Sequence, residues 1–209
     1  MICFDFDGVI ADSHDLWVAT CRTALAEVGV DLPSDARPFA RLRPLTFEQL
    51  ARDMGIDARA FAARMAELAL AAPRLPPLVP GMAELLRECA ELAPLALLSS
   101  SRQPFLEAVL RHHGLSGLFS IVAGGGTGQT KAETLASWSS ARIMIGDAAS
   151  DIDAARAAGV VSIGVTWGWQ AADVMSHADI VVDSPEDLAV AIRSHLSGAP
   201  GKGVGATKR

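Results

Sequence analysis

The chain begins with Met1-Ile2-Cys3-Phe4-Asp5-Phe6-Asp7-Gly8, an apolar run that two acidic residues interrupt and a glycine ends. The apolar residues predict a short buried strand ending at Gly8, where a glycine allows a sharp turn. Two like charges this close repel each other strongly unless a cation or a proton lies between them. The opening stretch therefore predicts a strand that leads directly into a polar site.

Residues downstream of 80 alternate between strand-like and helix-like patterns. We predict helices at 82–92, 104–113, 151–158 and 185–195, a further helix after Lys131, and strands at 95–98, 119–122, 142–145, 160–165 and 179–182. Such alternation is typical of an α/β fold with a mostly parallel, Rossmann-like sheet. We therefore assign residues 1–13 and 81–196 to one core that includes the first strand.

Residues 14–80 differ from this core, because their apolar residues recur at three-to-four spacing and no strand is apparent. Four prolines between 73 and 80 end the helical pattern, since proline cannot continue a helix. We predict an inserted α-helical cap domain at 14–80 that acts as a lid. Residues 197–209 lack a periodic apolar pattern and are expected to form a flexible tail.

The composition excludes several classes of partner. A net charge of −6 does not suit binding to nucleic acid or to an anionic membrane surface, which both need a basic patch. The chain shows neither a signal peptide nor an apolar run of membrane-spanning length, and its three cysteines lack metal-type spacing. We expect a cytoplasmic protein, a monomer or homodimer, that acts on a small solute.

Acidic residues follow two of the predicted strands. Ligands of open α/β sheets collect at the carboxyl ends of the strands, where Asp5 and Asp7 follow the first strand and Asp147 and Asp151 a later one. Asp5 and Asp7 are two residues apart, so an extended chain would direct both carboxylates to one side. Carboxylate oxygens suit a hard cation. These four residues are therefore candidate ligands for Mg²⁺.

Groups that could hold a phosphate follow other strands. Lys131 is the only lysine before the tail, and Ser99 and Ser100 follow the strand at 95–98. An ammonium group and hydroxyl donors suit a phosphoryl group. The glycine-rich stretch 124–128 lacks the spacing of a nucleotide-binding loop, so we interpret it as a flexible loop. In the predicted cap, the candidates for contact with the rest of the substrate are His14, Arg41 and Arg43.

These motifs, taken together, resemble those of the haloacid dehalogenase-like superfamily. Asp5-Phe6-Asp7-Gly8-Val9-Ile10-Ala11-Asp12-Ser13 is similar to the first motif of that family and Ala96-Leu97-Leu98-Ser99 to the second. Lys131 corresponds to the third and Ile145-Gly146-Asp147-Ala148-Ala149-Ser150-Asp151 to the fourth. The helical insertion resembles the cap of phosphoglycolate phosphatases and β-phosphoglucomutases, although it is somewhat short. Lys131 also lacks the proline that often follows this lysine.

The resemblance implies a phosphatase that uses Mg²⁺ and an aspartyl-phosphate intermediate. Asp5 would be the nucleophile, and Asp7 would protonate the leaving oxygen and then activate water. Asp5, the backbone carbonyl of Asp7 and Asp147 would hold the ion, supported by Asp151. Ser99 and Lys131 would bind the phosphoryl group, with Ser100 as a further substrate contact.

Other activities of the superfamily fit the chain less well. Dehalogenases do not use the acid at position 7, and phosphonate hydrolysis resembles a reaction of a cap lysine, which residues 14–80 lack. A sugar-phosphate mutase of the β-phosphoglucomutase type and a non-catalytic, phosphate-binding regulatory protein remain alternatives. We expect hydrolysis of a small phosphorylated metabolite, as in phosphoglycolate phosphatases.

Overall fold

The structure is a computed structural model, and it describes residues 1–32, 38–40 and 42–198. The strands in these residues are β1 (Ile2–Phe4), β2 (Leu95–Arg102), β3 (Phe119–Gly125), β4 (Ile143–Gly146), β5 (Val161–Val165) and β6 (Ile180–Val182). The α-helices are α1 (His14–Ala26), α2 (Phe47–Asp53), α3 (Ala58–Leu70), α4 (Met82–Leu92), α5 (Gln103–His112), α6 (Lys131–Ala136), α7 (Ala149–Ala158) and α8 (Pro185–Leu196). Two short 3₁₀ turns are η1 (Ser116–Leu118) and η2 (Val174–His177).

The strands form one parallel sheet in the order β3-β2-β1-β4-β5-β6. β1 lies in the middle, where Ile2 pairs with Leu95 on one side and with Ile143 on the other. The carboxyl end of β1 therefore lies between the ends of β2 and β4. This arrangement confirms the predicted α/β, Rossmann-like fold with an inserted helical segment.

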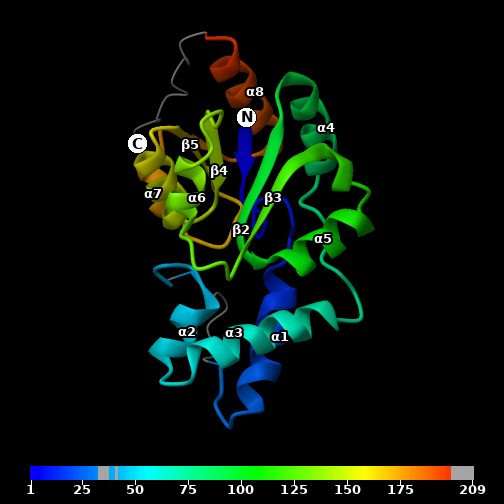
Figure 1. The fold of residues 1–209 in the computed structure, drawn as a ribbon, viewed down its shortest axis with the longest axis vertical. Coiled ribbons are helices and arrows are strands. Elements are labelled where there is room, and N and C mark those ends of the chain that lie inside the picture. Colours follow the sequence, from blue (N-terminus) through cyan, green and yellow to red (C-terminus); the bar gives the residue numbers. More distant parts are fainter. Residues whose placement is uncertain (33–37, 41, 199–209) are drawn as a thin grey trace, which may run out of the picture.

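Both faces of the sheet are covered, which explains why the strands are mostly apolar. Ile2, Phe4 and Leu97 face the side that α4, α5 and α8 cover. Cys3 and Met144 face the side that α6 and α7 cover. Figure 1 shows α4 and α5 on one side of the sheet and α6 and α7 on the other.

Helices α1, α2 and α3 lie together beyond the carboxyl ends of the strands (Figure 1). The two connections to this helical segment run side by side: the Asp12 N–H donates to the Pro77 carbonyl and the Val79 N–H donates to the Ile10 carbonyl, each at 2.9 Å. The entry and exit of the insertion are thus joined by backbone hydrogen bonds. The division into a core and a cap at residues 13 and 80 stays a prediction.

The largest differences from the predicted bounds are at the ends of β1, β2 and β3. β1 ends at Phe4, before Gly8, and β2 continues to Arg102, so that Ser99 and Ser100 lie within the strand. The prediction of a loop over 124–128 is wrong for its first two residues, because β3 continues to Gly125. A Cβ atom at Gly125 would collide with the backbone carbonyl of Ser100. The glycine therefore permits the close approach of β3 to the end of β2.

None of the helices in the described part of the chain is both long and apolar enough to cross a bilayer.

Candidate active site

A cavity with a volume of about 50 Å³ lies at the carboxyl end of the sheet. Asp5 and Asp7, which follow β1, form one part of the cavity wall. Ser99 of β2 and Lys131 of α6 form another part. Leu42 and residues 45–48 of the helical insertion form the opposite side. The cavity thus lies between the sheet and the insertion, at the edge where ligands of such sheets bind.

Three buried carboxylates meet beside this cavity. One oxygen from each of Asp5, Asp147 and Asp151 lies within 4.8 Å of the other two, and the residues are 6%, 1% and 0% exposed. Asp5 Oδ1 and Asp147 Oδ1 are buried without a hydrogen-bond partner. Buried carboxylates of this kind need a neighbouring cation, and oxygen ligands of this number suit Mg²⁺. The three residues therefore fit the expected metal.

Lys131 is the protein's own cation in this cluster. Its Nζ lies 2.6 Å from Asp151 Oδ1 and 3.0 Å from Asp5 Oδ1, and only the contact with Asp151 has the geometry of a hydrogen bond. Burial by itself lowers the pKa of Lys131, but the carboxylates of Asp151 and Asp5 outweigh burial and raise it. The lysine is the first residue of α6, which a capping box of Thr130 and Glu133 begins.

The two acids that follow β4 titrate at higher pH than exposed aspartates. Burial raises the pKa of Asp147 well above its usual range, the charges of Asp5 and Asp151 raise it further, and the Trp169 N–H at 2.5 Å opposes them. Burial also raises the pKa of Asp151 to about 6, although Lys131 opposes the shift. Bringing a divalent cation among these groups would favour their charged forms.

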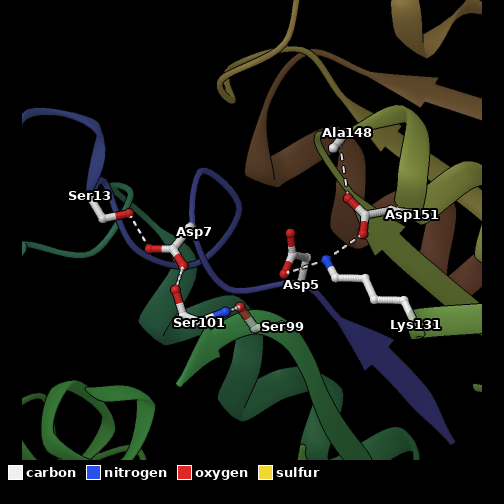
Figure 2. Close-up of polar contacts among 8 residues, drawn as sticks. All are labelled: Asp5, Asp7, Ser13, Ser99, Ser101, Lys131, Ala148 and Asp151. Atoms are coloured by element: carbon white, nitrogen blue, oxygen red, sulfur yellow. Dashed lines mark hydrogen bonds and ion pairs between the residues drawn. The ribbon is translucent and has the colours of Figure 1, made fainter. Parts of the chain in front are cut away.

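The Asp7 carboxylate has different partners from that of Asp5. It accepts hydrogen bonds from Ser13 Oγ (2.6 Å), Trp17 Nε1 (2.7 Å) and Ser101 Oγ (2.5 Å). Figure 2 shows the side chain directed towards these serines, whereas that of Asp5 meets Lys131. Burial raises the pKa of Asp7, and the three hydrogen bonds oppose that shift.

Asp5 and Asp7 both line the cavity, but their carboxylates have separate partners there. β1 ends at Phe4, and Asp7 forms an isolated β-bridge with Ala11 on the two sides of a turn at residues 8–10. Gly8 is the first residue of this turn, with a φ of 77°, and a Cβ atom there would collide with Asp147 Oδ2. The Asp7 carboxylate is not part of the three-acid cluster.

The end of β2 presents two buried serines to the site. Ser99 and Ser101 are 4% and 7% exposed, whereas Ser100 is exposed and also lines the cavity. The Ser101 N–H donates to Ser99 Oγ at 3.1 Å. Sequence reasoning missed Ser101, although the two-residue period of a strand that continued past residue 98 would have placed it on the same side as Ser99.

The cap candidates lie in different places. His14 does not line the cavity but packs edge-to-face against Phe39 and Trp169, with ring centroids 5.8 and 5.7 Å apart. Arg43 lines a separate hollow beside α7. Arg41 lies outside the described residues. The residues of the insertion that do line the cavity, which sequence reasoning missed, are Leu42, Leu45, Thr46, Phe47 and Glu48.

The segment after β5 links the insertion to the acidic cluster. The Trp169 N–H donates to Asp147 Oδ2, and its ring stacks on Phe39 with centroids 5.3 Å apart. Gln170 is buried, and its Oε1 accepts from the Ala149 N–H while its Nε2 donates to the Leu42 carbonyl, each at 2.9 Å. Two successive residues therefore contact both sides of the cavity.

A family model described as haloacid dehalogenase-like hydrolase matches residues 2–165. This span includes Asp5, Lys131, Asp147 and Asp151 of the site just described. The chain belongs to the haloacid dehalogenase-like hydrolase family. A phosphoglycolate phosphatase from Synechococcus elongatus is 33% identical over 205 residues, which cover 91% of this chain and 96% of the relative. The family and this relative make the chain an enzyme that hydrolyses phosphate esters.

Two further comparisons bear on the substrate and on the fold. The tyrosine-protein kinase PtkA of Mycobacterium tuberculosis is 29% identical over 212 residues, covering 91% of this chain and 72% of the relative. The crystal structure of a predicted phosphatase from Clostridium acetobutylicum matches with a TM-score of 0.79 at 21% identity, covering 92% of this chain and 97% of that one, and supports the fold. Similarity within this family therefore leaves the substrate open.

Proposed function

We propose that this haloacid dehalogenase-like hydrolase is a Mg²⁺-dependent phosphatase that cleaves a small phosphomonoester through an aspartyl phosphate on Asp5. The observation that carries the proposal is the position of Asp5. Its carboxylate lines the cavity, is paired with Lys131 and lies among two further buried acids. A carboxylate held in this way is oriented as a nucleophile and relieved of part of its charge repulsion.

In the proposed reaction, an Asp5 oxygen attacks phosphorus as the bond to the leaving oxygen breaks. Asp7 gives a proton to that oxygen, and in the second step it takes a proton from the water that hydrolyses the aspartyl phosphate. The raised pKa of Asp7 suits the first of these roles, because the proton has to be present at the start. Ser99 and Lys131 would hold the oxygens of the transferring group.

The metal would be held by Asp5, Asp147 and the backbone carbonyl of Asp7, with Asp151 in support. When bound, Mg²⁺ supplies positive charge that offsets the phosphate oxygens and the clustered acids. The two buried carboxylate oxygens without a hydrogen-bond partner, on Asp5 and Asp147, support this assignment. Lys131 keeps Asp151 and Asp5 at fixed positions beside them.

The test is release of inorganic phosphate from a panel of phosphomonoesters, with Mg²⁺ or with EDTA. We expect release that depends on Mg²⁺ and is lost in Asp5→Asn. Asp153→Asn is the matched control, because Asp153 lies on α7 only two residues from Asp151 but its side chain is 72% exposed. Near-normal turnover in Asp5→Asn would contradict the mechanism. Product isomerisation without phosphate release would instead indicate the mutase.

A further inference from the structure

We infer that the leaving group of the substrate is compact, carries hydrogen-bond donors such as a hydroxyl or an ammonium group, and bears no second anionic group. The inference rests on the proposed phosphatase function and concerns the part of the substrate that is not the phosphate. The residue that imposes this preference is Glu48.

The two sides of the cavity differ in chemistry. The side formed by the sheet holds Asp5, Lys131 and Ser99, which the proposed reaction uses for the phosphoryl group. The side formed by the insertion consists of three apolar side chains, the hydroxyl of Thr46 and the carboxylate of Glu48. Within the described residues, no lysine, arginine or histidine of the insertion lines the cavity.

Glu48 is not needed to complete the helix on which it lies. Thr46 begins α2 and its Oγ1 accepts from the Gln49 N–H at 3.2 Å. Arg52, one turn further on, donates to Gln49 Oε1 at 3.2 and 3.3 Å instead of pairing with Glu48. Glu48 forms no hydrogen bond or ion pair with any residue in the described ranges. Its carboxylate is thus available to the cavity.

A carboxylate accepts hydrogen bonds and does not donate them, so a ligand group that meets Glu48 has to supply the donor. Ser100, whose hydroxyl also makes no hydrogen bond within the described part of the chain, lines the cavity as well. A hydroxylated or amine-bearing leaving group satisfies both residues. Its carbon atoms can contact the apolar side chains of Leu42, Leu45 and Phe47.

A second anion would have no cation to meet on this side of the cavity among the described residues. Lys131 is already paired with Asp5 and Asp151, and Arg43 lines the separate hollow that includes Asp153 and Asp173. Two like charges roughly 6 Å apart, at a dielectric between that of a protein surface and bulk water, cost about a factor of ten in affinity. Glu48 therefore disfavours carboxylates and second phosphates.

The size of the cavity adds a second limit. Its volume of about 50 Å³ is small beside the roughly 300–1,000 Å³ of pockets that bury drug-sized ligands. A phosphoryl group with a leaving group of a few carbons suits a cavity of this size better than a large substrate does. The preference against a second anion differs from the name of the cyanobacterial relative, since phosphoglycolate bears a carboxylate in addition to its phosphate.

The test uses two substrates that differ only at the end of the leaving group, 2-hydroxyethyl phosphate and 2-phosphoglycolate. We expect the wild-type kcat/KM to be at least about tenfold higher for the hydroxyl compound. In Glu48→Gln this ratio should fall by about tenfold, mainly through a lower KM for phosphoglycolate. Glu84→Gln is the matched control, because Glu84 is likewise a first-turn acid, on α4, but does not line the cavity. Its ratio should equal that of the wild type.

Different results overturn the two proposals. A wild-type enzyme that prefers phosphoglycolate, or a ratio that Glu48→Gln leaves unchanged, would refute the inference while Mg²⁺-dependent phosphate release upheld the proposed function. Release from other phosphomonoesters but from neither member of the pair would have the same meaning. Absence of release from every compound would overturn the proposed function and the inference with it.

Discussion

Ser101 offers a direct test of how the protein controls Asp7. Its hydroxyl donates to Asp7 Oδ2 at 2.5 Å, and the residue is 7% exposed. A hydrogen bond to a charged group contributes about 1.5–3 kcal/mol, and each pKa unit corresponds to about 1.36 kcal/mol. Ser101→Ala favours the protonated form of Asp7, because it removes a donor to the carboxylate. The pKa of Asp7 should therefore rise by about one to two pH units.

The assay is the pH profile of kcat for wild type and variant. The part of the kcat profile that depends on the ionisation of Asp7 should move to higher pH in Ser101→Ala. Circular dichroism should show that the variant remains folded. Ser137→Ala serves as the control, because this serine lies at the exposed end of α6 and its hydroxyl bonds only to the Thr134 carbonyl. A profile that moves by less than about 0.3 pH units would refute the argument that this hydrogen bond opposes protonation of Asp7.

Three further predictions concern stability. Lys131→Met leaves Asp5 and Asp151 buried without their cation, so it should lower the free energy of unfolding in EDTA by about 3–5 kcal/mol, measured by urea denaturation, and abolish turnover. Unchanged stability would contradict the electrostatic role of the lysine. Gly125→Ala should destabilise the protein by about 1–3 kcal/mol, since its Cβ would collide with the Ser100 carbonyl, and an unchanged midpoint in the same assay would contradict the collision. The pKa of Asp151 in the folded protein, about 6, exceeds the value of about 3.9 in an unfolded chain, so the folded state binds more protons between these values. The contribution of Asp151 to the free energy of unfolding in EDTA should therefore decrease as the pH rises from about 4 to 6, and thermal melts of wild type against Asp151→Asn, in which this pH dependence should be weaker, measure it.

Much of the sheet could be predicted from the sequence because its strands are short, apolar and separated by helices with clear periodicity. The predicted strand at 160–165, for example, differs from β5 by a single residue. The errors occurred where tertiary packing outweighs local preference. A loop was predicted at Gly124 and Gly125 because glycine has a low propensity for strands. In the fold, however, only a residue without a side chain fits beside the end of β2.

The candidate site was predictable in part for the same reason. The positions of Asp5, Asp147 and Asp151 follow from strand ends that have to converge in a parallel sheet. The surroundings of Asp7 could not be predicted, because Trp17 belongs to the insertion and Ser101 to a strand 94 residues away in sequence. Periodicity also does not say which part of a helical insertion faces a cavity. The sequence suggested Arg43, whereas the structure places Glu48 there.

The hydrogen bonds of Gln170 have a consequence for the exchange of insertions between members of this family. One amide side chain joins the backbone at Leu42 to the backbone at Ala149, and its neighbour Trp169 contacts both Phe39 and Asp147. A chimaera that receives residues 14–80 from a relative would lose the matched partners of this segment. Transferring a new substrate preference would therefore require residues 167–170 to be exchanged together with the insertion.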